Sequence, residues 1–223
     1  MSPSLASGGL SSHVTGYNSI SNLAWSNILN IERGYIMNIY IKRALWCAVA
    51  TFGFLANVAL AGDITPKMQT KIDTYKKQSA VWAADPAIVK AVKDANTQGP
   101  ISGMGNAKWR ELKESDPTVS GFITNATGQL LTKWMNADAK GINKIVLSGN
   151  KSHRVAYTSM PAKYIGKGAP NFDEPIEGKL WHQGESKPDP STDIDSVQIA
   201  APVKDGKEVI GVLLISLTAA NLK

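Results

Sequence analysis

The strongest constraint on the fold is a hairpin signal near the C-terminus. Two apolar segments, IDSVQIAAPVK and EVIGVLLISLT, flank the turn DGK at residues 205–207, and Asp-Gly between apolar runs favours an antiparallel hairpin. From Ser196 to Val203 apolar residues alternate with polar or small ones, so we expect one apolar and one mixed face. The second segment is apolar on both sides, which predicts a central strand.

Three further strands are predicted before this hairpin. INKIVLSG (142–149) and HRVAYTSM (153–160) are separated by a short polar link, which predicts a second hairpin, and KLWHQG (179–184) predicts a third strand. The segment 161–178 is rich in proline and glycine, so it is too irregular for a strand. We expect it to be a connector that covers the mixed face of the sheet.

The first part of the same region has helical spacing. Apolar residues recur every three or four positions from Ile64 to Trp82, which predicts a long amphipathic helix. Asp85-Pro86 then restarts a helix, and Asp116-Pro117 opens another that we expect to reach Met135. Helices followed by a strand meander predict an α+β fold, with the long N-terminal helix packed on a five-stranded antiparallel sheet.

Residues 37–61 have the layout of a secretory signal peptide. Lys42 and Arg43 are followed by the apolar run Ala44–Val58 and the small-x-small sequence Ala59-Leu60-Ala61. We therefore expect a periplasmic or secreted protein; the alternative is an uncleaved N-terminal anchor. A signal acts from an N-terminus, so we expect residues 1–36 to be disordered or a mis-assigned upstream extension, with Met37 as the start. Residues 62–223 would then form a single domain.

Composition argues against several function classes. Without residues 1–61 the formal net charge falls from +6 to +4, because Arg33, Lys42, Arg43 and Glu32 leave, and the lysines are scattered, so we expect no nucleic-acid partner. The single cysteine lies in the leader, and the two remaining histidines have no nearby acidic or cysteine partner, so no metal is expected. No nucleophile-elbow or metalloprotease motif occurs; we expect neither an enzyme nor a cofactor. The aspartates of DPSTDID (189–195) suit a solvated loop.

The sequence resembles the Cache (PAS-like) extracytoplasmic sensor domains over residues 64–222. The resemblance is carried by DPAIVKAVKDAN, INKIVLSGNKSHRVAYTS, KYIGKG and VQIAAPVKDGKEVIGVLLISL. It implies that a small metabolite of the amino acid, carboxylate or amine class binds on the sheet face away from the long helix. The family's Arg-x-Trp-Tyr arrangement is absent, so its amino-acid ligands are not carried over. Receptors of the family continue into a transmembrane helix after the last strand, whereas this sequence ends at Lys223. We therefore expect the protein to act through a partner protein.

The candidate ligand-binding residues lie on the predicted strands and the connector. They combine aromatic rings, a cation for a carboxylate, and polar groups: Tyr157, Tyr164, Trp181, Arg154, Gln198 and His182. The alternative for each aromatic residue is core packing, and for Arg154 a solvated position. Strand alternation places Arg154 and Tyr157 on opposite faces unless a bulge intervenes.

Two hypotheses about function follow. The first is a periplasmic or secreted small-molecule-binding sensor module of the Cache type, which acts through a membrane receptor or a homodimer. The second is a structural or dimerising interaction protein of the cell envelope that binds no ligand. They differ in whether the connector covers a cavity with a free polar group or whether aromatic rings fill that space.

Overall fold

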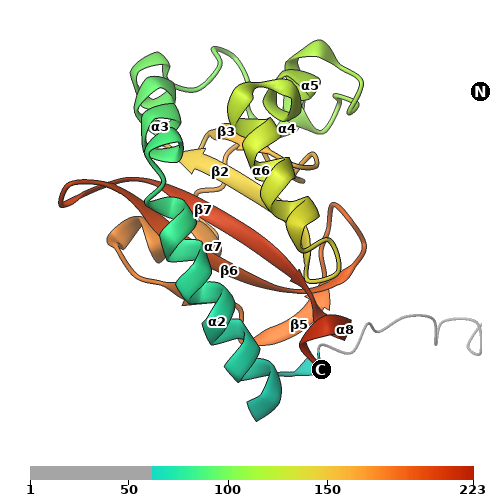
Figure 1. The fold of residues 1–223 in the computed structure, drawn as a ribbon. Helices are drawn as coiled ribbons and strands as arrows, with labels where there is room; N and C mark the ends of the chain where they lie inside the picture. The colour runs from blue at the N-terminus through green and yellow to red at the C-terminus, as the bar shows by residue number, and fades with distance from the viewer. Residues whose placement is uncertain (1–61) are drawn as a thin grey trace, which may run out of the picture. The chain divides into compact units, whose positions relative to one another are not determined.

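The computed structural model describes residues 62–223, and the predicted signal peptide at 37–61 and upstream extension at 1–36 lie outside them. Within the described part of the chain, none of the helices is long and apolar enough to cross a membrane. The elements, in chain order (Figure 1), are β1 (Gly62–Asp63), α2 (Pro66–Ala83), α3 (Pro86–Gln98), α4 (Asn106–Trp109), α5 (Pro117–Thr124), α6 (Ala126–Ala137), β2 (Ile142–Gly149), β3 (Arg154–Tyr157), α7 (Pro170–Asp173), the 3-10 helix η1 (Pro175–Glu177), β4 (Trp181–His182), β5 (Glu185–Pro188), β6 (Asp195–Asp205), β7 (Glu208–Thr218) and α8 (Ala219–Leu222).

All strand pairs are antiparallel, and the sheet order is β1-β5-β6-β7-β2-β3, with β4 also paired to β6. The predicted hairpin is present, because β6 and β7 pair from Ser196–Thr218 to Asp205–Glu208. Gly206 in its turn has φ 61°, a left-handed conformation that glycine adopts without steric cost. The α+β class and the antiparallel sheet are therefore confirmed.

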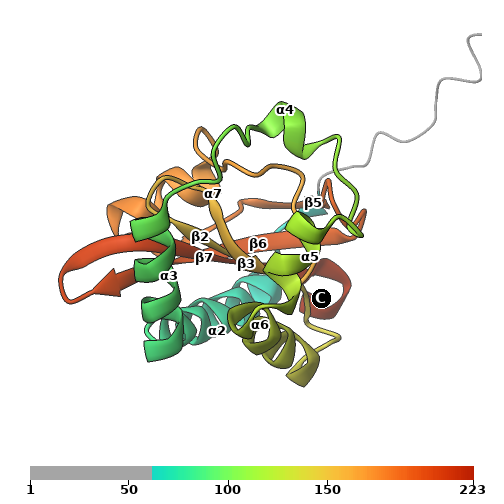
Figure 2. The ribbon, with the colours of Figure 1, turned by 90° about the horizontal axis from the view of Figure 1, so that it is seen from above.

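One face of the sheet is covered by three helices. Figure 2 shows the sheet nearly edge-on, with α2 and α6 on one side and α4 and α7 on the other. The apolar face of β6, predicted from its alternation, packs with Met68 and Ile72 of α2 and with Val92 of α3. Leu131 of α6 belongs to the same buried cluster. Burial of these side chains is the main favourable contribution to this side of the fold.

The helices begin where the sequence provides caps. Asp85 and Asp116 accept hydrogen bonds from the backbone N–H groups of Ala87 and Thr118, each at 2.8 Å, and a proline follows each cap. The single helix predicted from Asp116 to Met135 is instead two helices. Asn125 ends α5 and caps α6 through a 2.7 Å bond from the N–H of Gly128.

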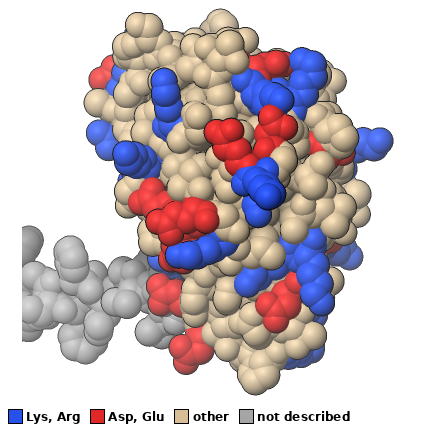
Figure 3. Space-filling model, turned by 90° about the vertical axis from the view of Figure 1, so that its left-hand side faces the viewer, with Lys and Arg blue, Asp and Glu red and all other residues tan. Residues whose placement is uncertain are grey.

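Within residues 62–223 the sheet contains seven strands, and the sequence predicted five. The two additional strands, β1 and β5, pair with each other and extend the edge of the sheet beside β6. β1 has only two residues and β5 has the polar sequence ESKP, so neither shows the apolar alternation on which strand prediction depends. The charged side chains are mixed in sign over the face shown in Figure 3.

We predict that Gly211→Ala destabilises the protein by about 1–3 kcal/mol, because strands β2 and β7 approach closely there. A Cβ at this position would lie 2.4 Å from the backbone oxygen of Ser148 and 2.8 Å from Cγ1 of Val92. Chemical unfolding gives the free energy difference. The matched control is Gly121→Ala in α5, where a Cβ meets nothing within 4 Å and alanine should add about 0.5–1 kcal/mol of stability. Equal unfolding midpoints for the two variants would contradict this prediction.

Candidate functional site

A cavity of about 340 Å³ lies on the sheet face away from α2, under the connector. Its floor comes from β2, β3, β6 and β7, and its walls come from the connector, β4 and the segment that joins β5 to β6. The lining residues used below are Lys144, Val146, Arg154, Trp181, Asp189, Gln198 and Leu214. The expected place of a ligand site, between the mixed face and the connector, thus contains open space.

Arg154 reaches the cavity because of an irregularity in the pairing of β2 with β3. Val146 pairs with Tyr157 and Ser148 pairs with Arg154, so the register shifts between Leu147 and Ser148. A bulge of this kind adds one residue to a strand and reverses the alternation beyond it. Arg154 and Tyr157 consequently share the face away from α2, which simple alternation excluded.

The Arg154 guanidinium is fixed by two hydrogen bonds. Its Nε donates to the carbonyl oxygen of Lys163 at 2.9 Å, and its Nη1 donates to Oγ of Ser148 at 2.7 Å. Gly166 faces it without a side chain; a Cβ there would lie 3.3 Å from Nη1. No acidic side chain in residues 62–223 forms an ion pair with Arg154. Burial lowers the pKa of Arg154 to about 10, so the side chain remains charged at neutral pH.

A buried ion pair between Lys144 of β2 and Asp189 forms another part of the lining. The two residues are 4% and 2% exposed. Burial acts to raise the pKa of Asp189, but the charge and hydrogen bonds of Lys144, with the bonds from Ser191, outweigh it and hold this pKa well below its usual range. Burial lowers the pKa of Lys144, and the attraction of Asp189 opposes that change. The prediction of a solvated loop at 189–195 is therefore wrong for Asp189.

Sequence reasoning missed Lys144 and Asp189. One signal was present, since Lys144 is the only charged residue within the strand INKIVLSG and alternates with Val146 on its mixed side. Asp189 stands between two prolines in a polar segment, where nothing local distinguishes a buried carboxylate from a solvated one. A lysine buried in a strand requires an acidic partner, but the sequence does not identify which one.

Gln198 of β6 lines the cavity in a fixed orientation. Its Oε1 accepts a hydrogen bond from Nδ2 of Asn171 at 2.8 Å, and its Nε2 donates to Oδ2 of Asp189 at 3.0 Å. Asn171 belongs to α7, a short helix within the connector. The side-chain amide of Gln198 therefore connects α7, which covers the cavity, to the Lys144–Asp189 ion pair.

The two candidate tyrosines are buried in an aromatic cluster beside the cavity and are not among its lining residues. The hydroxyl of Tyr157 donates to the carbonyl oxygen of Val119 at 2.9 Å, and the hydroxyl of Tyr164 accepts from the N–H of Ile101 at 2.8 Å. Trp109 contacts both rings, with centroids 6.2 and 5.3 Å away. The two tyrosine rings are therefore packed in the core, which was the alternative to a ligand-binding role. They lie beside the cavity and support the part of the connector that forms its wall.

Trp181 and His182 lie on opposite sides of β4. Trp181 pairs with Ala200 and lines the cavity. His182 pairs with Ile199, whose side chain belongs to the helix-covered core, and its Nδ1 lies 3.5 Å from Nζ of Lys76 on α2. Of the six predicted ligand-binding residues, the structure therefore brings Arg154, Trp181 and Gln198 together at the cavity and places the other three elsewhere.

We predict that Asp189→Asn destabilises the protein by about 3 kcal/mol at pH 7, because it leaves the charge of Lys144 buried without a counter-charge. Thermal or urea unfolding measures the loss. The matched control is Asp94→Asn, which removes the acidic partner of an exposed Lys90–Asp94 pair and should cost less than about 1 kcal/mol. Similar losses of stability in both variants would show that the buried Lys144–Asp189 pair stabilises the fold no more than an exposed pair does.

No protein-family model and no curated protein matches the sequence. Among solved structures, the chain is similar to the sensor domain of the V. cholerae histidine kinase DctB, with 14% identity and a TM-score of 0.46, over 70% of this chain and 52% of that one. It is also similar to the sensory domain of the Campylobacter jejuni chemoreceptor Tlp3 with isoleucine bound, with 13% identity and a TM-score of 0.38, over 71% and 66%. A third similar structure is the E. coli DcuS sensor domain, with 13% identity and a TM-score of 0.34, over 52% and 88%.

The chain spans about half the length of the DctB domain and just under two thirds of the Tlp3 domain. These neighbours are sensor domains of a histidine kinase, of a chemoreceptor and of DcuS.

Proposed function

We propose that this protein is a small-molecule-binding sensor module that holds a carboxylate-bearing metabolite in the cavity between its sheet and its connector. The observation that carries the proposal is Arg154, a cation on the cavity wall with no acidic partner among residues 62–223. Arg154 is partly buried, and partial removal of a cation from water is costly unless an anion or several acceptors replace the lost water. A ligand carboxylate would supply that anion.

The geometry of Arg154 suits a planar anion. A guanidinium carries five N–H donors, and the protein occupies one on Nε and one on Nη1. Both donors on Nη2 and the second on Nη1 have no acceptor among the described residues. Arginine binds carboxylates through two parallel hydrogen bonds, so the side chain is already oriented by the protein for a ligand of this kind.

The rest of the lining limits the size and character of the ligand. Val146 and Leu214 form an apolar part of the floor, and Trp181 contributes an aromatic wall. A volume of about 340 Å³ lies at the small end of ligand cavities, which hold roughly 300–1,000 Å³. The cavity therefore favours a compact acid with an apolar body.

The place of action and the partner extend the proposal beyond the cavity. We propose a periplasmic or secreted location, which rests on the predicted signal peptide at 37–61, and a single sensor domain at 62–223. We propose that a second protein transmits the binding event, either a membrane receptor or another copy of the chain. Ligand binding at the connector can alter the surface that such a partner contacts.

We predict that millimolar carboxylates raise the melting temperature of the protein, because a ligand bound only to the native state stabilises it by ~2.7 kcal/mol at about 100 times its Kd. The measurement is a thermal-shift screen of organic acids, amines, purines and isoleucine, the amino acid bound in the Tlp3 sensory domain. Arg154→Met should weaken binding of the best ligand about 10- to 100-fold, since it removes a charged hydrogen-bonding partner.

Arg110→Met is the matched control, because Arg110 is exposed after α4 and lies outside the cavity lining. This variant should keep the ligand response of the unmodified protein. A screen without any response would contradict the proposal and favour the second hypothesis, a dimerising interaction protein without a ligand. An undiminished response in Arg154→Met would show that the ligand binds elsewhere.

A further inference from the structure

The cavity lining contains charges of both signs. Arg154 and Asp189 line the same space, and a cation beside an anion would by composition suit a zwitterion, in which a carboxylate faces the arginine and an ammonium faces the aspartate. Of the described residues that line the cavity, Asp189 alone is acidic. The availability of its oxygens therefore decides whether an ammonium group can bind.

The oxygens of Asp189 are fully used within the protein. Oδ1 accepts from Nζ of Lys144, and also from the N–H of Ser191 at 3.0 Å and its hydroxyl at 2.7 Å. Oδ2 accepts from Nζ of Lys144, from Gln198 at 3.0 Å and from the hydroxyl of Ser216 at 3.2 Å. An ionised carboxylate has about four acceptor positions, so these six contacts leave none for a ligand.

Lys144 is equally saturated. Its ammonium donates to both oxygens of Asp189 and to Oγ of Ser191 at 2.7 Å, which uses all three of its donors. It is held in place by β2, where it pairs with Ser216 of β7 in the middle of the sheet. Lys144 and Asp189 thus present a neutral, closed pair, and the free donors of Arg154 remain.

An ammonium group in this cavity would meet unfavourable surroundings. It would lose its water shell, find no free carboxylate, and lie in the same cavity as Arg154, Lys163 and Lys187, whose like charges repel it. A carboxylate in the same cavity is favoured, because Arg154 offers hydrogen-bond donors that the described residues do not use. The lining therefore favours the carboxylate end of a zwitterion and disfavours its ammonium end.

Resting on the proposed function, we propose that Lys144 is a specificity-determining residue: by occupying Asp189, it restricts the cavity to acids that lack an ammonium group. An amino acid whose carbon skeleton matches a bound acid would be rejected because of its charge, although its size is similar. Removal of Lys144 would release the oxygens of Asp189 and convert the lining into one that accepts a zwitterion.

The experiment compares matched acids and amino acids by calorimetry or thermal shift. The probes are propionate with alanine, 3-methylbutanoate with valine, and butyrate with 4-aminobutyrate, so that the spacing between carboxylate and ammonium varies. For the unmodified protein, we expect each acid that fits to bind at least about tenfold more tightly than its amino partner. In Lys144→Met, we expect the affinity for the amino acids to rise at least about tenfold.

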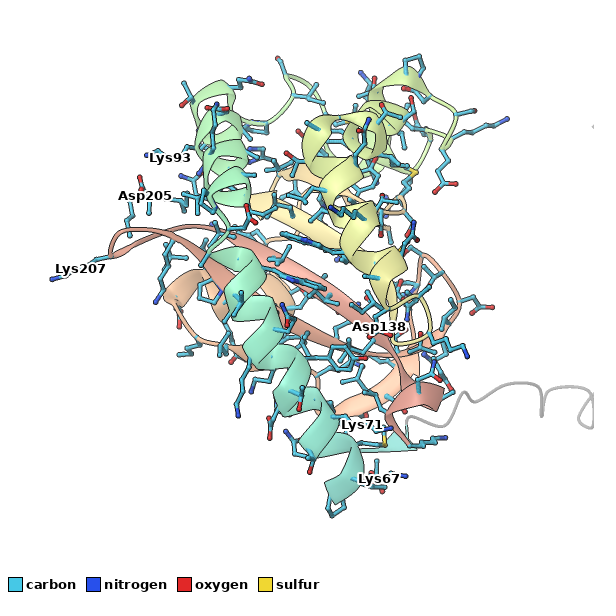
Figure 4. All side chains as sticks on the ribbon, in the orientation of Figure 1. Lys67, Lys71, Lys93, Asp138, Asp205 and Lys207 are labelled. Atoms are coloured by element: carbon cyan, nitrogen blue, oxygen red, sulfur yellow. The ribbon has the colours of Figure 1, made fainter. Side chains whose placement is uncertain are left out.

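Two further variants separate this gain from general loosening of the fold. The double variant Lys144→Met with Asp189→Asn has no charge at either position. It should still bind acids, and its affinity for amino acids should not rise above that of the unmodified protein. The matched control Lys93→Met removes a lysine that pairs with Asp205 at 2.6 Å on the helix-covered side, where Figure 4 shows both residues. It should retain the discrimination of the unmodified protein.

The outcomes distinguish this inference from the function on which it rests. Equal affinity of the unmodified protein for acids and their amino partners would overturn the inference while leaving the sensor function intact. This comparison needs no variant, so it holds even if Lys144→Met fails to fold. A folded Lys144→Met that gains no amino acid binding would also overturn it. No response to these probes or to any compound of the wider screen would overturn the proposed function, and the inference with it.

Discussion

The buried ion pair between Lys144 and Asp189 holds the segment after β5 against the floor of the sheet, and the cavity depends on it. Taking two charges out of water is costly, and their attraction offsets this cost only when additional hydrogen bonds satisfy both groups. Here Ser191, Gln198 and Ser216 complete the set around Asp189. The pair therefore fixes where the β5–β6 segment lies, and with it one wall of the candidate site.

The second determinant of the site is the bulge between β2 and β3. The register shift places Val155 and Ala156 together in the helix-covered core and returns Arg154 to the cavity side. Without it, regular alternation would put Arg154 and Tyr157 on opposite faces. One additional residue in a strand thus decides on which face of the sheet the charge of Arg154 lies.

The fold was largely predictable from local patterns. The hairpin around Gly206, the caps at Asp85 and Asp116, and the apolar alternation from Val197 to Val203 all give strong signals over short distances. The α+β class and the antiparallel sheet followed from them. The short edge strands β1 and β5 gave no such signal, because they have neither length nor apolar alternation.

The candidate site was predictable only in part. Sequence patterns supplied Arg154, Trp181 and Gln198, which line the cavity, but also Tyr157, Tyr164 and His182, which do not. A tyrosine that lines a pocket and a tyrosine that packs against Trp109 look the same in sequence, because the difference lies in which distant ring is nearby.

The sequence by itself determined the longer strands, the first helices, their order and the polarity of the sheet faces, since these depend on neighbours a few residues apart. Only the tertiary structure decided that Asp189 meets Lys144, 45 residues away, and that Arg154 has no acidic partner among the described residues. Charge pairing between distant segments is a property of packing, and no local pattern encodes it.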